Sequence, residues 1–596
     1  MNAALLAVIS IMIFWLGYRF YGGFLANKLF GQDDDFKTPA HEFKDGIDYV
    51  PSNKHVLFGH HFTSIAGAAP IVGPALGVIW GWVPAMIWVV FGSIFIGGVH
   101  DLGCLILSAK NKARSVADLA GVVISTRVRV LFLLLVMCLL WLVLAVFAFI
   151  IGWLFQKYPA TVLPINFQIV VAVVIGFTLY KLKIPLFWPS LAALLLLYAG
   201  IFPGVWSVEA LRIGNTQDFH PIFDSANAMG LGIGGVDLWI IILLIYAFIA
   251  SLLPVWILLQ PRDYINSLQL FVALGALYIG LFICHPEMPP GTALNTDVEG
   301  AIPIFPFLFV TIACGAISGF HSLVGSGTSS KQLNTLKDAH YIGYGSMIAE
   351  GLLAVIAILA CTAGFANKEA WQQHYCSWDA ARGLGPKISA FIEGGSSFLN
   401  QGFSIVSGLE LPAFFAPTML AIVVISFAAT TLDSACRIQR YIIGELGGAL
   451  KIKMLKNRYL GAAIAAFTPL ILAFMKASPG AGGNPKAYWQ LVWPIFGACN
   501  QMLAALALLL LTLYLACKGK KYIYTLIPFI FMTAITATAM ACNIKEFLQP
   551  GPGLPPNYLL LVISVALLAL SLWITVEGIL LFLKARSAKL SLPDLN

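Results

Sequence analysis

The sequence predicts an all-α membrane protein that crosses the bilayer many times. Hydrophobic residues make up 59% of the 596 residues, and charged residues make up only 10%. Soluble domains carry roughly 25% charged residues, so this chain lacks the polar side chains that would cover a water-facing surface. The mean hydropathy is +0.87. Several soluble domains in a row are therefore excluded, although the length alone would allow them.

About 15 apolar runs are long enough to cross the membrane as helices. The first run has no basic segment before it and no clear cleavage site, so we expect a retained helix and not a signal peptide. The fifth and sixth runs are the least regular, because Lys181, Lys183 and Pro185 lie between them. The predicted spans are residues 1–24, 56–80, 84–109, 129–156, 167–180, 185–203, 237–259, 264–284, 304–328, 341–366, 413–436, 458–475, 488–515, 523–543 and 558–583.

The distribution of lysine and arginine predicts the orientation, because cytoplasmic loops are enriched in both. With the basic loop 110–128 inside, alternation places the N-terminus outside and the C-terminus in the cytoplasm. The other loops predicted inside are 25–55, which is acidic, and the basic segments 329–340, 437–457, 516–522 and the tail from Lys584. The loops predicted outside are 204–236, 285–303 and 367–412. The net charge of +8 thus arises from basic loops on the cytoplasmic side, as expected for a protein of the cytoplasmic (inner) membrane. We expect no nucleic-acid partner.

Motifs typical of other function classes are missing from the sequence. The ten cysteines are scattered without a CxxC pair, which argues against structural zinc and against a disulfide framework. No GxxxxGK[ST] motif occurs, which disfavours ATP-driven transport. His41-Glu42 does not continue into HExxH. We therefore expect that the protein is not an enzyme and has no resident cofactor. The alternative from another functional class is an intramembrane protein that binds haem or zinc through the deep histidines.

Two predicted spans contain residues that break helices, and they run in opposite directions. The first reads GHHFTSIAGAAPIVGP over residues 59–74, and the second reads SGFHSLVGSGT over 318–328. Irregular backbone survives at this depth only where it lines a protein cavity, and paired broken helices in inverted positions indicate a transporter's binding site. We expect the helices to unwind near Ala66–Pro70 and near Gly325–Thr328. The alternative is close packing of small residues against neighbouring helices.

Deep ionisable residues lie in these spans and in their neighbours. At 1.5 Å per residue, they lie about 6–14 Å from the cytoplasmic ends of their spans, so we expect four histidines and an aspartate to share the inner half of the bundle. Buried ionisable groups in membranes are functional candidates, and histidine titrates near neutrality. For each histidine the alternative is a hydrogen bond that fixes helix packing, and their spacing supplies no i,i+3 or i,i+4 pair of metal ligands. The candidates are His60, His61, His100, Asp101, His321 and Glu350, with the polar or small neighbours Thr63, Ser64, Ala66, Ala69, Ser322 and Ser326.

A third polar cluster ends the span 413–436. It contains Thr430, Thr431, Asp433 and Ser434, whose hydroxyls, together with carbonyls from a broken helix, are suitable ligands for Na⁺. The alternatives are hydroxyl bonds to the preceding helical turn and an i,i+4 pair of Asp433 with Arg437. The segment 260–264, QPRDY, is predicted to be a cytoplasmic loop, either a gate or a plain turn.

These stretches resemble the CstA (carbon starvation protein A) family. The resemblance is carried by FGHHFTSIAGAAPIVGPALGVIWGWVPA from Phe58, GGVHDLGCLILSAKNKARSVADL from Gly97, LLPVWILLQPRDYIN at 252–266, HSLVGSGTSSKQL at 321–333 and TTLDSACRIQRY at 430–441. It implies peptide uptake during carbon starvation or, as in some relatives, pyruvate uptake coupled to protons. It also implies a relation to the amino acid–polyamine–organocation superfamily and a LeuT-like core of 5+5 inverted helices. Thr430 and Thr431 would then match the hydroxyl pair of sodium-coupled carriers.

We therefore predict a secondary transporter that takes up small peptides by alternating access. A carboxylate is expected at the half-helix that begins near Pro70, and the ammonium of a peptide is expected near Glu350 or Asp101. Pyruvate is the alternative substrate, and a channel is a weaker third option. The coupling ion is either a proton, on Asp101, His100 or Glu350, or Na⁺ at Thr430 and Thr431; we favour the proton.

The predicted organisation has four parts. They are an N-terminal helix and loop (1–55), a first repeat with an extra hairpin (56–303), a second repeat (304–515), and a C-terminal helix pair and tail (516–596). The extra hairpin is either 167–203 or 237–284. The expected partners are the substrate and membrane lipid, and the oligomeric state is left open.

Overall fold

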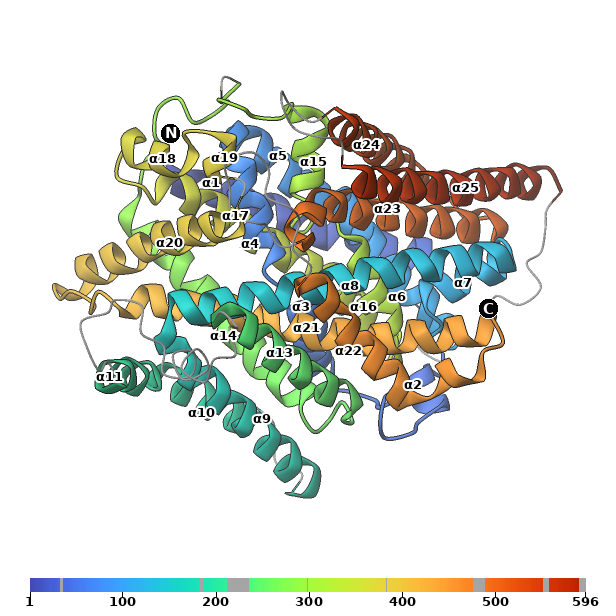
Figure 1. Cartoon of the computed structure of the whole chain (residues 1–596), viewed down its shortest axis with the longest axis horizontal. Helices are drawn as coiled ribbons and strands as arrows, with labels where there is room; N and C mark the ends of the chain where they lie inside the picture. Colours follow the sequence, from blue (N-terminus) through green and yellow to red (C-terminus); the bar gives the residue numbers. More distant parts are fainter. Residues whose placement is uncertain are drawn as a thin grey trace.

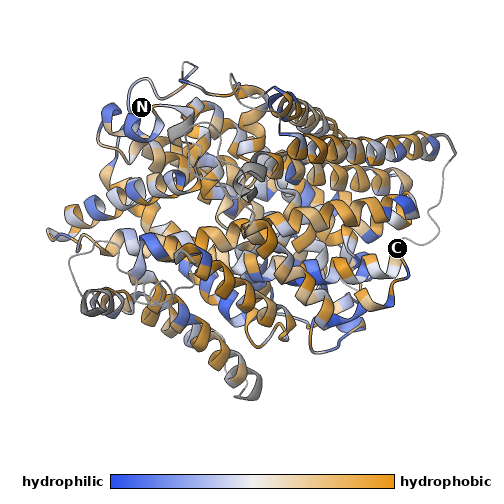
Figure 2. Ribbon diagram, viewed as in Figure 1, coloured by the Kyte–Doolittle hydropathy of each residue, from blue (hydrophilic) through white to orange (hydrophobic). Residues whose placement is uncertain are grey.

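The computed structural model describes residues 1–32, 36–182, 187–211, 235–296, 298–381, 383–474, 488–549 and 557–588. Within these ranges the chain is helical, and extended pairing is limited to three isolated bridges. The outer helices show mostly hydrophobic residues along the bundle, and hydrophilic residues gather at helix ends and loops (Figure 2). Large apolar side chains such as those of Trp188, Val170 and Val562 are exposed, as expected for surfaces that face lipid.

The helices follow the predicted spans closely. In the first half of the chain they are α1 (Ala3–Leu16) with π-helical turns to Phe30, α2 (Pro39–Glu42), α3 (Lys54–Ala66), α4 (Ala69–Gly77), α5 (Trp82–Gly92), α6 (Gly98–Lys110), α7 (Val116–Val123), α8 (Thr126–Lys157), α9 (Val162–Leu182), α10 (Phe187–Ala199), α11 (Ile201–Leu211), α13 (Gly235–Leu252) and α14 (Leu259–Cys284). In the second half they are α15 (Ile304–Thr311), α16 (Gly319–Gly327), α17 (Gly345–Ala363), α18 (Lys368–Tyr375), α19 (Trp378–Ala381), α20 (Leu384–Ser407), α21 (Phe415–Ala449), α22 (Arg458–Phe474), α23 (Tyr488–Cys517), α24 (Ile523–Leu548) and α25 (Tyr558–Ala588).

Among the described residues, 12 helices are long and apolar enough to cross a membrane, and the bent pair α3–α4 would make 13. Two further predicted spans, 304–328 and 458–475, form the shorter helices α15, α16 and α22. The prediction of an all-α polytopic protein is confirmed.

The first broken helix lies where it is expected. α3 ends at Ala66, α4 begins at Ala69, and the two are bent by 43°. Gly67, between them, has φ +52, a conformation that is unfavourable for residues other than glycine. Pro70 lies in the first turn of α4, where its missing amide hydrogen costs nothing.

The second break lies upstream of its predicted place. The prediction of unwinding near Gly325–Thr328 is wrong, because α16 is helical from Gly319 to Gly327. The non-helical linker is 312–318, in which Gly315 has φ +96 and Ser318 is extended. The small residues of α16 serve close packing instead: a Cβ on Gly319 would lie 2.1 Å from the carbonyl oxygen of Asn500 on α23.

The two broken helices pack antiparallel at the centre of the bundle. α3 contacts α16, and α4 contacts α15, so the first half of each broken helix lies beside the second half of the other. Their opposite directions, predicted from the alternation of loops, are therefore confirmed. α21 packs on α3 and α16, and α17 packs on α3 and α4. These contacts hold the two breaks in one place.

The remaining core helices have the order that a LeuT-like core requires. After the broken helix α3–α4 come α5–α6, α8, α13 and α14, and after the broken helix α15–α16 come α17, α21, α22 and α23. The corresponding pairs α8–α21 and α13–α22 contact each other, as helices around an approximate two-fold axis would. The predicted inverted arrangement is thereby confirmed, whereas the four-part division of the chain stays a prediction.

The structure also distinguishes the two candidates for the extra hairpin. α9, α10 and α11 lie at the edge of the bundle, at the lower left of Figure 1. In contrast, α13 packs on α8, α21 and α22, and α14 packs on α3. The described helices α9 and α10 of the candidate 167–203 therefore lie outside the core, and α13 and α14 of the candidate 237–284 belong to it.

One predicted loop is largely helical. Residues 367–412, expected to be an outer loop, contain α18, α19 and α20. α20 packs against α14, α17, α21 and α4, and Gly394 approaches α17 so closely that a Cβ would lie 2.0 Å from the carbonyl oxygen of Ala360. The polar composition of α20 predicted a loop, but packing against neighbouring helices stabilises it as a helix. Most of the predicted outer loop 204–236 lies outside the described residues.

Candidate substrate and ion site

The predicted site residues all lie within the core around the two breaks. Their side chains are buried except for that of Ala69, which is half-buried. They come from α3 and α4, from α6, from α16, from α17 and from α21. The structure separates them into three groups, each with its own partners.

The first group is a chain of four ionisable side chains. The two oxygens of Asp101 accept from His100 Nδ1 at 2.7 Å and from His321 Nδ1 at 2.9 Å. His321 Nε2 lies 3.3 Å from Glu350 Oε2. Glu350 Oε1 accepts the backbone N–H of Gly315 at 3.0 Å, inside the second break. The predicted proximity of these residues is confirmed; their predicted role in carrying a proton stays a prediction.

The histidines of α3 have partners other than Asp101 and Glu350. His60 Nδ1 lies 2.6 Å from Asp263 Oδ2 on α14. His61 Nδ1 lies 2.7 Å from the hydroxyl of Ser329, just after α16. Adjacent residues on a helix face directions about 100° apart, which sends neighbouring histidines to different helices.

The second group surrounds a buried arginine that the sequence placed in a cytoplasmic loop. Arg262 and Asp263 lie near the N-terminus of α14 and are at most 2% exposed. The Arg262 guanidinium donates to Asp263 Oδ1 at 2.8 Å, to the Tyr246 hydroxyl at 2.7 Å and to Asp433 Oδ2. The prediction that 260–264 forms a cytoplasmic loop is therefore wrong, because these residues belong to α14. Tyr246 also donates to Asp433 at 2.8 Å, so four helices meet here when His60 is included.

The third group contains the hydroxyls expected to hold Na⁺. Thr431 Oγ1 donates to the carbonyl oxygen of Ser64 at 3.1 Å, and the hydroxyls of Ser64 and Ser434 lie 2.8 Å apart. Thr430 Oγ1 instead accepts from Asn266 Nδ2 at 2.8 Å and donates to the Ser426 carbonyl. Of the predicted pair, only Thr431 therefore faces the first break.

Other predicted hydroxyls bond to their own helices. Thr63 donates to the carbonyl of Gly59, Ser322 to that of Gly319 and Ser326 to that of Ser322. These are hydroxyl bonds to the preceding helical turn, of the kind named above as the alternative for the cluster in 413–436. Ser326 also accepts the N–H of Val116 at 3.1 Å, which ties α16 to the start of α7.

The suggested pair of Asp433 with Arg437 is wrong. Arg437 Nη1 donates instead to Asp48 at 2.9 Å, in the segment between α2 and α3. Burial by itself would raise the pKa of Asp48, but the guanidiniums of Arg437 and Arg440 outweigh it and hold the pKa below its usual value. The segment between α2 and α3 is thereby held against α21 at the end of the core.

Several residues of the site were missed by the sequence analysis. Tyr246, Asn266 and Ser329 complete the hydrogen bonds of predicted residues, and Asn500 on α23 accepts the N–H of Phe320 at 3.0 Å. Asn266 and Ser329 lie in stretches that carry the family resemblance, whereas Tyr246 and Asn500 lie in apolar spans without a motif. The polar segment 260–264 was the only feature of the sequence that indicated a role for Arg262 and Asp263.

Comparisons with known proteins identify the family of this chain. The family model described as carbon starvation protein CstA matches residues 2–375 and 378–539. The chain belongs to the CstA family. A CstA relative from Bacillus subtilis, named peptide transporter CstA, is 30% identical over 559 residues, covering 89% of each chain. The Escherichia coli protein of the same name is 31% identical and covers 90% of this chain and 80% of its own.

A further relative from Escherichia coli, named pyruvate/proton symporter BtsT, is 28% identical, over 91% of this chain and 82% of its own. Among solved structures, a mutant manganese transporter from Eremococcus coleocola is 12% identical with a TM-score of 0.45, covering 91% of this chain and 99% of its own. MhsT bound to L-phenylalanine has the same identity and TM-score, with 90% and 99% covered.

Proposed function

We propose that this protein is a secondary active transporter that takes up small peptides by alternating access. The observation that carries the proposal is the antiparallel contact of two broken helices, α3–α4 and α15–α16, with buried ionisable groups on both sides of the breaks. Helix breaks expose backbone groups that can bind a substrate, and inverted pairs allow one half of the core to rock against the other. The names of the relatives support transport and give no support to an enzyme.

Peptides are the substrate that the relatives favour, with pyruvate as the alternative. The relatives from Bacillus subtilis and Escherichia coli with about 30% identity are named peptide transporters, and the one with 28% identity is named a pyruvate/proton symporter. Both substrates have a carboxylate, for which the N-terminus of α4 at the first break is suited. A peptide also has an ammonium group, which pyruvate lacks.

Protons are favoured over sodium as the coupling ion. The Thr430 hydroxyl makes hydrogen bonds to Asn266 and Ser426. A sodium site at the first break would therefore lack one of its predicted ligands. The guanidinium of Arg262 contacts Asp433, one helical turn from Thr430, and its positive charge opposes a second cation nearby. Besides the predicted carriers Asp101, His100 and Glu350, we propose Asp433 as a further proton carrier, because its Oδ1 has no hydrogen-bond partner among the described residues. The groups that face it are Arg262, Asp263 and Tyr246.

The substrate is tested by competition in vesicles that contain the purified full-length protein. We expect saturable uptake of a labelled dipeptide that excess unlabelled dipeptide abolishes and excess pyruvate leaves unchanged. Empty vesicles are the control. Saturable pyruvate uptake that excess dipeptide does not reduce would reverse the choice of substrate and retain the transporter.

The coupling ion is tested in the same vesicles. We expect an inward proton gradient without Na⁺ to drive dipeptide uptake and a protonophore to abolish it. With Asp433→Asn, the gradient should no longer accelerate uptake, whereas exchange of labelled for unlabelled dipeptide should persist, because exchange requires no net proton movement. Uptake that follows a Na⁺ gradient at fixed pH would instead assign the coupling to sodium.

We infer that the protein lies in the cytoplasmic membrane with its N-terminus outside and its C-terminus inside. The basic residues of loop 110–128 and of the segment after α21 support this orientation, because positive charges are retained in the cytoplasm. Labelling of single introduced cysteines in intact cells would test it. A membrane-impermeant reagent should react at residue 2 and fail to react at residue 520.

A further inference from the structure

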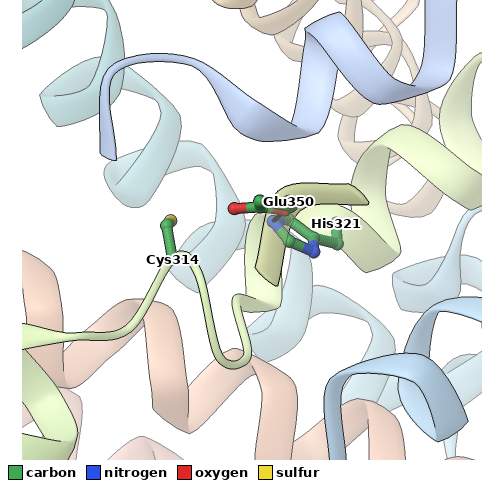
Figure 3. Close-up of side chains that lie close together, drawn as sticks. All are labelled: Cys314, His321 and Glu350. Carbon is green, nitrogen blue, oxygen red and sulfur yellow. Dashed lines mark ion pairs between the residues drawn. The ribbon is translucent and has the colours of Figure 1, made fainter. Parts of the chain in front are cut away.

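Three potential metal ligands meet at the second break. Cys314 lies in the linker between α15 and α16, His321 in the first turn of α16, and Glu350 in α17. One ligand atom from each lies within 4.8 Å of the other two, and all three residues are buried. Figure 3 shows the Cys314 side chain on the linker and the Glu350 carboxylate beside the His321 ring.

The second polar atom of each ionisable ligand is already occupied. His321 Nδ1 bonds to Asp101 Oδ2, and Glu350 Oε1 accepts the N–H of Gly315. His321 Nε2 and Glu350 Oε2 remain, 3.3 Å apart as an ion pair, but neither atom makes a hydrogen bond within the described residues. Two buried polar atoms without hydrogen bonds are costly, and a cation between them would satisfy both.

We propose that Cys314, His321 and Glu350 bind one divalent transition-metal ion of the Zn²⁺ class. Thiolate, imidazole and carboxylate are the ligands that Zn²⁺ takes, at about 2.0–2.3 Å, and three protein ligands leave one coordination position open. The 4.8 Å limit on the present separations leaves room for an ion at the centre of the three atoms. A small inward rotation of side chains would complete the site. The hard ions Na⁺ and Mg²⁺ are disfavoured by the sulfur ligand.

Asp101 is placed to support such a site. A histidine that binds metal through one nitrogen usually donates its other N–H to a carboxylate, which orients the ring. Asp101 has this relation to His321, and His100 holds the other oxygen of Asp101 at 2.7 Å. In this chain, His321 and Glu350 would bind the metal, and Asp101, held by His100, would orient the His321 ring. Because the three ligands come from separate segments, spacing along the sequence could not reveal them.

Metal binding is tested on the purified full-length protein in detergent, so the result does not depend on transport. We expect one Zn²⁺ per chain after loading and desalting. With Co²⁺ in place of Zn²⁺, we expect the absorption band of a thiolate bound to cobalt. Cys314→Ser should remove this band and the retained zinc. Cys361→Ser, which changes another buried cysteine outside the cluster, should leave both intact.

A variant of the supporting shell provides a second measurement. Asp101→Asn retains all three ligands and should weaken Zn²⁺ binding about 10- to 100-fold, with the thiolate–cobalt band still present at saturation. Gel filtration of each variant verifies that it is folded. A wild-type protein that retains no more zinc than Cys314→Ser, or a cobalt spectrum without a thiolate band, would overturn the proposal. A zinc-binding protein that fails to take up dipeptide would overturn the proposed function alone.

Discussion

Replacing Arg262 by methionine is expected to destabilise the protein by about 3–5 kcal/mol, the range for breaking a buried ion pair. The guanidinium contacts Asp263, Asp433 and Tyr246, and the arginine and both acids are at most 2% exposed. Without it, two carboxylates lose their shared cation in a region that water does not reach. Methionine fills most of the volume, so the effect arises from charge and not from a cavity. Thermal unfolding of the purified protein, followed by fluorescence, measures it.

Two further variants identify the cause. Asp433→Asn added to Arg262→Met should recover part of the lost stability, because one uncompensated charge disappears. Arg114→Gln is the matched control at the surface: Arg114 is 39% exposed and lies 3.6 Å from Asp118, and such pairs contribute about 0–1 kcal/mol. If Arg262→Met unfolds at the same temperature as Arg114→Gln, the buried network does not stabilise the fold.

Gly67→Ala is expected to have the second large effect, because Gly67 forms the first break. Its φ and ψ are +52 and −149, a region close to one that is essentially limited to glycine. An added Cβ would lie 2.7 Å from Thr431 Oγ1 and 3.0 Å from the Phe147 ring. Positive φ by itself costs an alanine about 1–2 kcal/mol, and the contact with α21 adds to it. Either the break or the packing against α21 must change.

We therefore expect Gly67→Ala to lower the unfolding temperature and to reduce dipeptide uptake about tenfold or more, since a 1.4 kcal/mol loss in the substrate-binding state is already tenfold. Gly275→Ala is the control, because Gly275 lies within α14 and a Cβ there meets no atom within 4 Å. Wild-type uptake by Gly67→Ala at wild-type stability would show that this break has no special role. Reduced stability with normal uptake would separate the structural effect from the proposed function.

Composition and local pattern were sufficient for the membrane class, the approximate spans and the first break. Transfer of apolar runs into lipid depends on each segment alone, and so does the effect of Gly67 and Pro70 on a helix. The opposite directions of the two broken helices also followed from the sequence, because each span reverses the direction of the chain. For these features, neighbours in the sequence carry the necessary information.

The second break shows where that information ends. The segment 319–327 and the linker 312–318 both contain glycine, and local propensity favoured the wrong one. α16 stays helical because Gly319 allows close contact with α23, and Asn500 accepts the N–H of Phe320. α20 is a similar case, since its polar sequence becomes helical where Gly394 packs on α17. In both, a partner distant in the chain supplies the stabilising energy.

Side-chain partners were decided only by tertiary structure. Asp433 bonds to Arg262 and not to its neighbour Arg437, and His60 and His61 reach different helices. The residues Cys314, His321 and Glu350 come together from three segments. The sequence determined that these polar groups would be buried in a membrane-spanning core. Which of them meet depends on the direction in which each helix turns its side chains, and this is set by the packing of the whole bundle.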